Sequence, residues 1–172
     1  METIINFIIN LFSGITGSAF GREIVVFIIS MLPILELRGG LLASALLKVN
    51  PIVGYIVSMI GNIIPVPFIL LFINKILNWM EKSKVKWINS LAKWIRKKAD
   101  KHKGQIEKYG YVGLLLFVGI PLPGTGAWTG CLIASVLNMD KKKSFLAAAI
   151  GVLMAGIIIS VLSIGLFDGL LK

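Results

Sequence analysis

The chain has 172 residues, a formal net charge of +10, 56% hydrophobic residues and a mean hydropathy of +0.88. This composition is too apolar for an ordinary soluble surface and indicates an integral membrane protein, with residues 1–172 as a single domain. One cysteine excludes an internal disulfide, and one histidine beside it argues against a zinc site, so we expect no metal.

The first apolar run, residues 3–20, is diluted by asparagine, serine, threonine and glycine. It has no basic residue before it and is therefore not expected to be a cleaved signal peptide. It predicts either a weak spanning helix or a segment in the membrane interface, and both interpretations stay open.

The next apolar run, residues 24–47, is interrupted by Pro33 and by the Glu-Leu-Arg-Gly-Gly segment at 36–40. Each apolar side covers about 14 Å, roughly half of the hydrocarbon core. The run therefore forms either one kinked spanning helix or a hairpin that returns to the same side. Charged side chains at membrane depth cost about 2.5–3.5 kcal/mol and indicate a functional site by default.

Residues 52–73 follow a tight turn and form a full-length apolar span of about 33 Å, with prolines that predict a kink. Asn62 within it predicts either a hydrogen bond between helices or a contact with substrate.

Residues 74–103 predict an amphipathic helix, with Trp87, Leu91, Trp94 and Ile95 on one face. Ten basic residues lie between positions 80 and 109, opposed by three acidic ones. In a membrane protein such a cluster indicates the cytoplasmic side, and the tryptophans favour a helix on an anionic leaflet over a nucleic-acid partner.

Residues 111–137 repeat the earlier pattern. One apolar arm runs into a break at 121–130, Pro-Leu-Pro-Gly-Thr-Gly-Ala-Trp-Thr-Gly, and a second arm leads out of it. Residues 145–167 then form a second full-length span, whose glycines favour close helix packing.

A shift of 90 or 91 residues superposes these two halves: Gly40 meets Gly130, and Gly61 meets Gly151. We therefore predict repeat 1 at about 21–78, a basic cytoplasmic segment at about 79–108 and repeat 2 at about 109–172. If 111–137 crossed the membrane, the lysines at 141–143 would lie outside, against the positive-inside bias. The bias thus favours two hairpins that enter from opposite sides, an inverted repeat typical of secondary transporters.

In each hairpin the second arm begins at the break, near Gly39-Gly40 and near Gly126-Ala127. Helix starts carry free N–H groups and partial positive charge, so two of them meeting at mid-depth would bind an anion such as phosphate. The guanidinium of Arg38 suits phosphate oxygens, and Glu36 could pair with it or carry a proton. The candidate substrate-binding residues are Glu36, Arg38, Gly39, Gly40, Thr125, Gly126, Trp128 and Thr129. The alternative is structural: Glu36 and Arg38 form a buried pair, the glycines permit the turn, and Trp128 packs.

The segments at 36–40 and 121–130 resemble the small multidrug export protein family of bacteria and archaea, and the resemblance covers about residues 30–160. That family is thought to share its architecture with the DedA family, which has two membrane-dipping hairpins, each packed by a spanning helix. DedA members are implicated in proton-coupled translocation of undecaprenyl phosphate. Glu36 matches the acidic residue of their first hairpin, whereas the second break here lacks their charged residues.

We therefore expect an all-α integral membrane protein, a DedA-like inverted repeat of a re-entrant helical hairpin plus a transmembrane helix, multi-pass in the inner (cytoplasmic) membrane. Its expected function is secondary transport of an anionic amphipath, most plausibly a polyprenyl-phosphate lipid, with protons as the candidate coupling ion. The alternative is efflux of cationic drugs, with Glu36 as the binding carboxylate. A lipid-phosphate enzyme would need a metal-ligand or His-rich cluster that the chain lacks, and a scaffold would not need charged breaks. We expect no enzyme activity, no cofactor, membrane lipids as partners, and a homodimer as the candidate oligomer.

Overall fold

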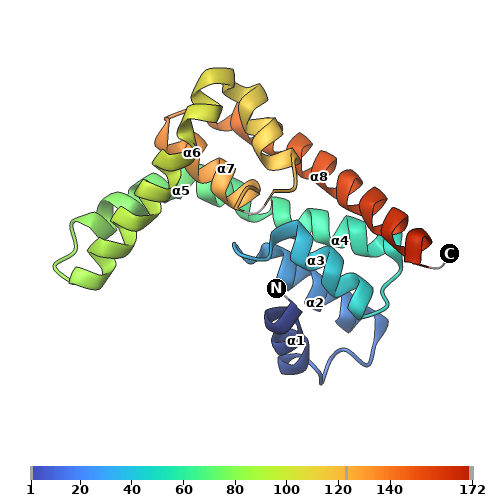
Figure 1. Ribbon diagram of the computed structural model, residues 1–172. Coiled ribbons are helices and arrows are strands. Elements are labelled where there is room, and N and C mark those ends of the chain that lie inside the picture. Colours follow the sequence, from blue (N-terminus) through green and yellow to red (C-terminus); the bar gives the residue numbers. More distant parts are fainter. Residues whose placement is uncertain (1, 123, 171–172) are drawn as a thin grey trace. The chain divides into compact units, whose positions relative to one another are not determined.

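The computed structural model describes residues 2–122 and 124–170, and this part of the chain is all helical, as the sequence predicted (Figure 1). The helices are α1 (Glu2–Leu11), α2 (Ala19–Met31), α3 (Glu36–Leu46), α4 (Pro51–Ile63), α5 (Pro65–Glu81), α6 (Lys86–Gly119), α7 (Ala127–Val136) and α8 (Lys141–Leu170). Within the described residues, two stretches are long and apolar enough to cross a membrane: Pro51–Glu81, which combines α4 and α5, and Lys141–Leu162 of α8. Both predicted full-length spans are therefore present as helices.

The chain forms two compact units. The first runs from the N-terminus to Pro65 and includes the residues from Val152 onward, and the second comprises Val66–Gly151. The first break, between α2 and α3, belongs to the first unit, and the second break, between α6 and α7, belongs to the second.

In the first unit, α2 and α3 form an antiparallel hairpin (Figure 1). The Ser18 hydroxyl caps α2 by accepting from Gly21 N–H at 3.0 Å, and Pro33 follows the last turn of that helix. The guanidinium of Arg22, near the start of α2, donates to the carbonyl of Leu47, at the end of α3, at 3.2 Å. The two ends of the run 24–47 therefore lie together, which favours the hairpin over the kinked helix. The hairpin has a buried apolar core, to which α1 contributes Ile5. The core residues are Ile5, Val25, Val26, Ile29, Leu35 and Ala43.

Helix α4 packs against both arms of this hairpin. A left-handed residue, Lys48 (φ 52°), ends α3, and Val49 N–H donates back to Ser44 O at 2.9 Å. Asn50 then caps α4 by accepting from the N–H of Ile52 at 3.0 Å, with Pro51 in the first turn. This turn combines an αL helix end with an asparagine N-cap and a proline in the first turn of the next helix, each preferred at its position.

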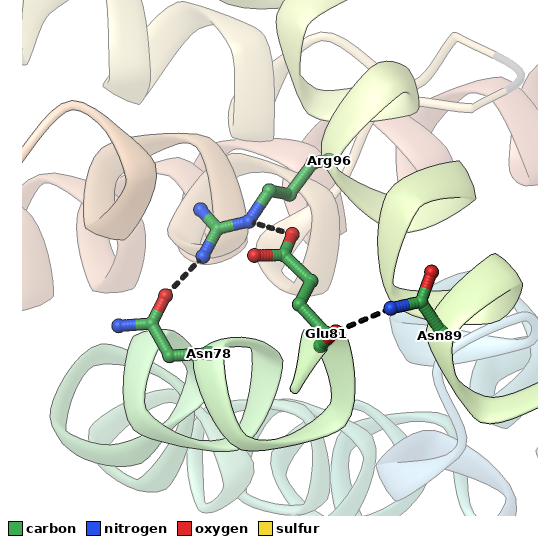
Figure 2. A network of polar contacts seen from close by, with 4 residues as sticks. All are labelled: Asn78, Glu81, Asn89 and Arg96. Carbon is green, nitrogen blue, oxygen red and sulfur yellow. Dashed lines mark hydrogen bonds and ion pairs between the residues drawn. The ribbon is translucent and has the colours of Figure 1, made fainter. Parts of the chain in front are cut away.

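In the second unit, α6 folds back on the end of α5. Figure 2 shows Arg96 of α6 donating to the carboxylate of Glu81 and to the side-chain oxygen of Asn78, while Asn89 donates to the backbone carbonyl of Glu81. The prediction of one helix over 74–103 is therefore wrong. The chain turns at 82–85, where the hydroxyl of Ser83 accepts from Val85 N–H at 3.2 Å.

Helix α6 has two apolar faces. Trp87 and Trp94, on the face predicted from the sequence, are 72% and 59% exposed, so this face is available to a membrane surface. A different face, at seven-residue spacing, is packed inside: Ala92, Ala99 and Ile106.

Gly110 divides α6, because its left-handed backbone (φ 57°, ψ −130°) interrupts the helical conformation. The part after Gly110, residues 111–119, packs against α7 as a second hairpin. The hydroxyl of Tyr111 accepts from Asp140 N–H at 3.2 Å, which brings the start of the first arm to the end of the second. A left-handed residue, Asn138 (φ 51°), ends α7.

The N-terminal run does not form one helix over 3–20. Helix α1 ends at Leu11, and residues 12–17 form turns before α2 begins at Ala19. At 1.5 Å per residue α1 is about 15 Å long, which is too short to cross a bilayer.

Candidate functional sites at the two helix breaks

Glu36 is the first residue of α3 and lies directly after the first break. Its backbone is left-handed (φ 49°), a conformation that costs a non-glycine residue about 1–2 kcal/mol. The N–H of Glu36 donates to Leu32 O at 2.8 Å, which closes the break after Pro33. The residue is only 9% exposed. A buried carboxylate on strained backbone is an arrangement that clusters at functional sites.

Arg38 is half-buried on the same turn and interacts electrostatically with Glu36. Both residues lie in the first unit. Whether they act as a pair stays a prediction.

The two glycines are required by packing. A Cβ on Gly39 would lie 2.5 Å from the Cβ of Leu35, and one on Gly40 would lie 1.8 Å from the Oγ of Ser30. The N–H of Gly39 donates to Leu35 O at 2.8 Å, and α3 begins at Glu36, three residues before the predicted start. The N–H of Gly39 is therefore engaged in the helix. Both glycines lie inside α3, where close packing requires them, rather than in the turn that the structural interpretation assigned to them.

A buried polar layer between α3 and α4 was not recognised from the sequence. A Cβ on Gly54 would lie 1.8 Å from Ser44 Oγ, and one on Gly40 would lie 2.8 Å from Ser58 Oγ. Positions 44 and 40 of α3 thus face positions 54 and 58 of α4. Continued by one helical turn, this antiparallel register predicts position 36 opposite Asn62. The four-residue spacing of Gly54, Ser58 and Asn62 was the signal available in the sequence.

This layer contains polar atoms that the packing leaves unpaired. Ser58 is fully buried and Asn62 is 2% exposed. Neither Ser58 Oγ nor Asn62 Oδ1 has a hydrogen-bond partner among the described residues. Unpaired buried groups of this kind cost about 1–3 kcal/mol each. The Ser30 hydroxyl, also fully buried, donates to Val26 O at 2.8 Å and can still accept.

The second break is closed by Thr125. Its hydroxyl lies 3.0 Å from Ile120 O and 2.8 Å from Leu122 O, either of which can accept its proton, and it accepts from Leu122 N–H at 3.2 Å. Gly124 (φ 85°) and Gly126 (φ 148°) adopt positive φ angles that side chains disfavour. In this structure Thr125 therefore holds the loop, and a ligand role would require it to exchange partners. Pro123 of the predicted segment lies outside the described residues.

Helix α7 begins at Ala127, as predicted, and its Gly130 N–H donates to Gly126 O at 2.9 Å. Trp128 and Thr129 lie in its first turn and are partly buried. Gly130 is a packing residue, because a Cβ there would lie 2.8 Å from a methyl of Val118.

The candidate residues thus fall into two groups. Glu36, Arg38, Gly39 and Gly40 come together in the first unit, and Thr125, Gly126, Trp128 and Thr129 come together in the second. The meeting of both groups around one substrate stays a prediction. In the described part of the chain, no three His, Cys, Asp or Glu residues are grouped so that they could hold a metal ion.

A family model described as "Putative small multi-drug export protein" covers residues 36–158, a range that begins at Glu36 and includes the segments at 36–40 and 121–130. No curated protein and no solved structure matches the chain. Because the match covers more than half of the 172 residues, the chain belongs to the small multi-drug export protein family.

Proposed function

We propose that the protein is a secondary transporter of the cytoplasmic membrane that uses the Glu36–Arg38 pair at the first break to bind a charged amphipathic substrate. The observation that supports this most directly is Glu36, a buried carboxylate on left-handed backbone next to a half-buried arginine. A purely structural pair would not require the strained conformation.

The polar layer supports proton coupling. When an anionic substrate occupies Arg38, Glu36 loses its charged partner and would be neutralised by a proton. Its O–H then needs an acceptor. The candidate is Asn62, which the register of α3 and α4 would bring opposite position 36 if continued by one turn, and whose Oδ1 is buried and has no partner among the described residues. In this proposal Arg38 stabilises the charged carboxylate of Glu36, and the polar layer stabilises the neutral carboxyl by accepting its hydrogen bond.

The inverted repeat is part of the same proposal. A Cβ on Gly61 would lie 2.7 Å from Phe27 O, and one on Gly151 would lie 2.8 Å from Leu115 O. The same close approach of a spanning helix to a hairpin arm thus occurs once in each unit. The partners Phe27 and Leu115 are offset by 88 residues and the glycines by 90, so the extra two residues of repeat 2 fall between the hairpin arm and the spanning helix, in a range that includes its break.

Two substrate classes remain in the proposal. Arg38 and the start of α7 favour an anionic amphipath such as a polyprenyl-phosphate lipid. At the first break this support is weaker, because the N–H of Gly39 already donates to Leu35 O within α3. The family description favours the second class, cationic drugs, for which Glu36 would be the binding carboxylate.

Reconstitution into liposomes, with separate assays of lipid-phosphate translocation and cationic drug transport, distinguishes the two classes. Lipid-phosphate movement that is lost in Arg38→Ala supports the first, and drug movement that is lost in Glu36→Gln but kept in Arg38→Ala supports the second. Glu23→Gln, a partly buried carboxyl near the start of α2, is the control for loss of one acidic group. Wild-type rates in both site variants would overturn the transporter proposal.

A further inference from the structure

We propose that the groove between α5 and the first turn of α8 binds one acidic phospholipid of the cytoplasmic leaflet. This site is separate from the two helix breaks, and it does not depend on which substrate the protein transports.

The groove has a volume of about 310 Å³ and lies entirely within the second unit. Its lining residues are Pro67, Leu70, Leu71, Lys141, Lys142 and Phe145. The walls are therefore apolar, with charge contributed only by the two lysines. Leu70 is 6% exposed and forms the floor, whereas Leu71 is 47% exposed, so the groove opens to the surroundings of the protein. An apolar channel of this kind fits an acyl chain.

The groove lies where α8 changes from basic to apolar and where a lysine interrupts the apolar sequence of α5. On α5, Lys75 follows Leu71 by one helical turn, and on α8, the three lysines at 141–143 are separated from Phe145 by Ser144 alone. In a spanning helix this change marks the boundary between the hydrocarbon core and the headgroups. A lipid in the groove would thus have its acyl chain against Leu70 and Leu71 and its phosphate at the level of the lysines.

The charges at the rim select an acidic headgroup. Lys141 and Lys142 line the groove, whereas Lys143 lies over the ring of Tyr111, with its Nζ 5.8 Å from the ring centroid. Asp140 is engaged at the start of α8, where its carboxylate accepts from Lys143 N–H at 2.9 Å. Two lysines attract the phosphate of any phospholipid but repel the cationic amine of a zwitterionic one. A headgroup with net negative charge, as in phosphatidylglycerol, is therefore preferred.

From the sequence alone, the lysines at 141–143 indicate only which side of the membrane is cytoplasmic. The groove becomes visible only when α5 is placed beside them, because Leu70 and Lys141 are far apart in the chain.

Photo-crosslinking in lipid nanodiscs tests the site. The full-length protein is reconstituted in phosphatidylcholine with a trace of phosphatidylglycerol that carries a photoactivatable acyl chain, and the labelled peptides are identified by mass spectrometry. We expect label on α5 near Leu71 and on α8 near Phe145. The double variant Lys141→Ala/Lys142→Ala should lose labelling on the order of tenfold. The control Lys84→Ala/Lys86→Ala removes the same charge from exposed positions of the basic segment and should retain it.

A second pair of variants tests the apolar wall without changing charge. Leu71→Trp fills the groove and should abolish the label, whereas Leu146→Trp, at a position 61% exposed and outside the lining, should not. Equal labelling by a phosphatidylcholine probe, equal losses in the two lysine pairs, or absence of label from both segments would overturn the proposal. The last result would also be expected if a partner helix, rather than a lipid, filled the groove.

Discussion

Lys48 and Asn138 adopt the same left-handed backbone conformation, with φ angles of 52° and 51°, at positions 90 residues apart. The bonds around them are also the same: Val49 N–H donates to Ser44 O at 2.9 Å, and Met139 N–H donates to Ala134 O at 2.9 Å. The next residue in each turn is an N-cap, Asn50 or Asp140. Each second arm therefore passes into its spanning helix through the same turn, which supports the repeat that we propose.

Lys48 and Asn138 should respond oppositely to exchange of their side chains. Asparagine tolerates the left-handed region better than lysine, so Lys48→Asn should stabilise the protein by about 0.5–1 kcal/mol and Asn138→Lys should destabilise it by a similar amount. For a chain of this size we expect thermal unfolding midpoints to move by about 2–4 °C in opposite directions. Shifts of the same sign would contradict the equivalence of the two turns.

Gly40→Ala should destabilise the first unit. The added Cβ would lie 1.8 Å from Ser30 Oγ and 2.8 Å from Ser58 Oγ, and overpacking of this kind costs about 1–3 kcal/mol. The matched control is Gly104→Ala, because no atom within 4 Å would meet its Cβ and alanine is the better helix former. In detergent, the denaturation midpoint of Gly40→Ala should be lower than that of the wild type, whereas the midpoint of Gly104→Ala should be unchanged or higher. A neutral Gly40→Ala would show that α3 and α4 are not packed as described.

Glu36 and Asn62 should be energetically coupled. Continued by one turn, the register between α3 and α4 brings their positions opposite each other, where the side-chain amide introduced by Glu36→Gln would donate permanently to Asn62 Oδ1, as a neutral Glu36 would. In a double-mutant cycle, Glu36→Gln and Asn62→Leu should deviate from additivity by about 0.6 kcal/mol, the average for hydrogen bonds between membrane helices, and by at most about 1.7 kcal/mol. Glu36→Gln and Asn10→Leu, an exposed position on α1, should add. Additive effects in both cycles would remove Asn62 from the proposed coupling path.

The inverted topology predicts opposite labelling of the two turns. In a Cys131→Ala background, a cysteine at Lys48 should react with a membrane-impermeant thiol reagent from outside the cell. A cysteine at Asn138 should react only from the cytoplasmic side, because the basic segment and the lysines at 141–143 orient that turn. Cys131 is fully buried, so a small alanine is the least disruptive replacement. Labelling of both turns from one side would exclude the inverted repeat.

The sequence was sufficient to identify the spans, the second break and the start of α7, and it located the first break to within a few residues. Apolar length, proline and glycine act locally, and a membrane-depth charge such as Glu36 is conspicuous against its neighbours. The same local signals failed between residues 74 and 103. The periodic apolar residues that predicted the helix, from Trp87 to Ile95, all follow the turn at 82–85, so they say nothing about the residues before it. The fold-back depends on Arg96 reaching Glu81 and Asn78, which no local pattern reveals.

By itself, the sequence determined that this is an all-helical chain with two apolar spans and two polar interruptions, because hydrophobicity and backbone preference are properties of neighbouring residues. The tertiary structure decided which contacts stabilise the two interruptions. Only packing shows that Gly40 is required by Ser30, that Thr125 is engaged in closing its own loop, and that α4 presents Ser58 and Asn62 to α3. These relationships depend on which faces of the helices meet, and the choice among helix faces is made by close packing between residues far apart in the chain.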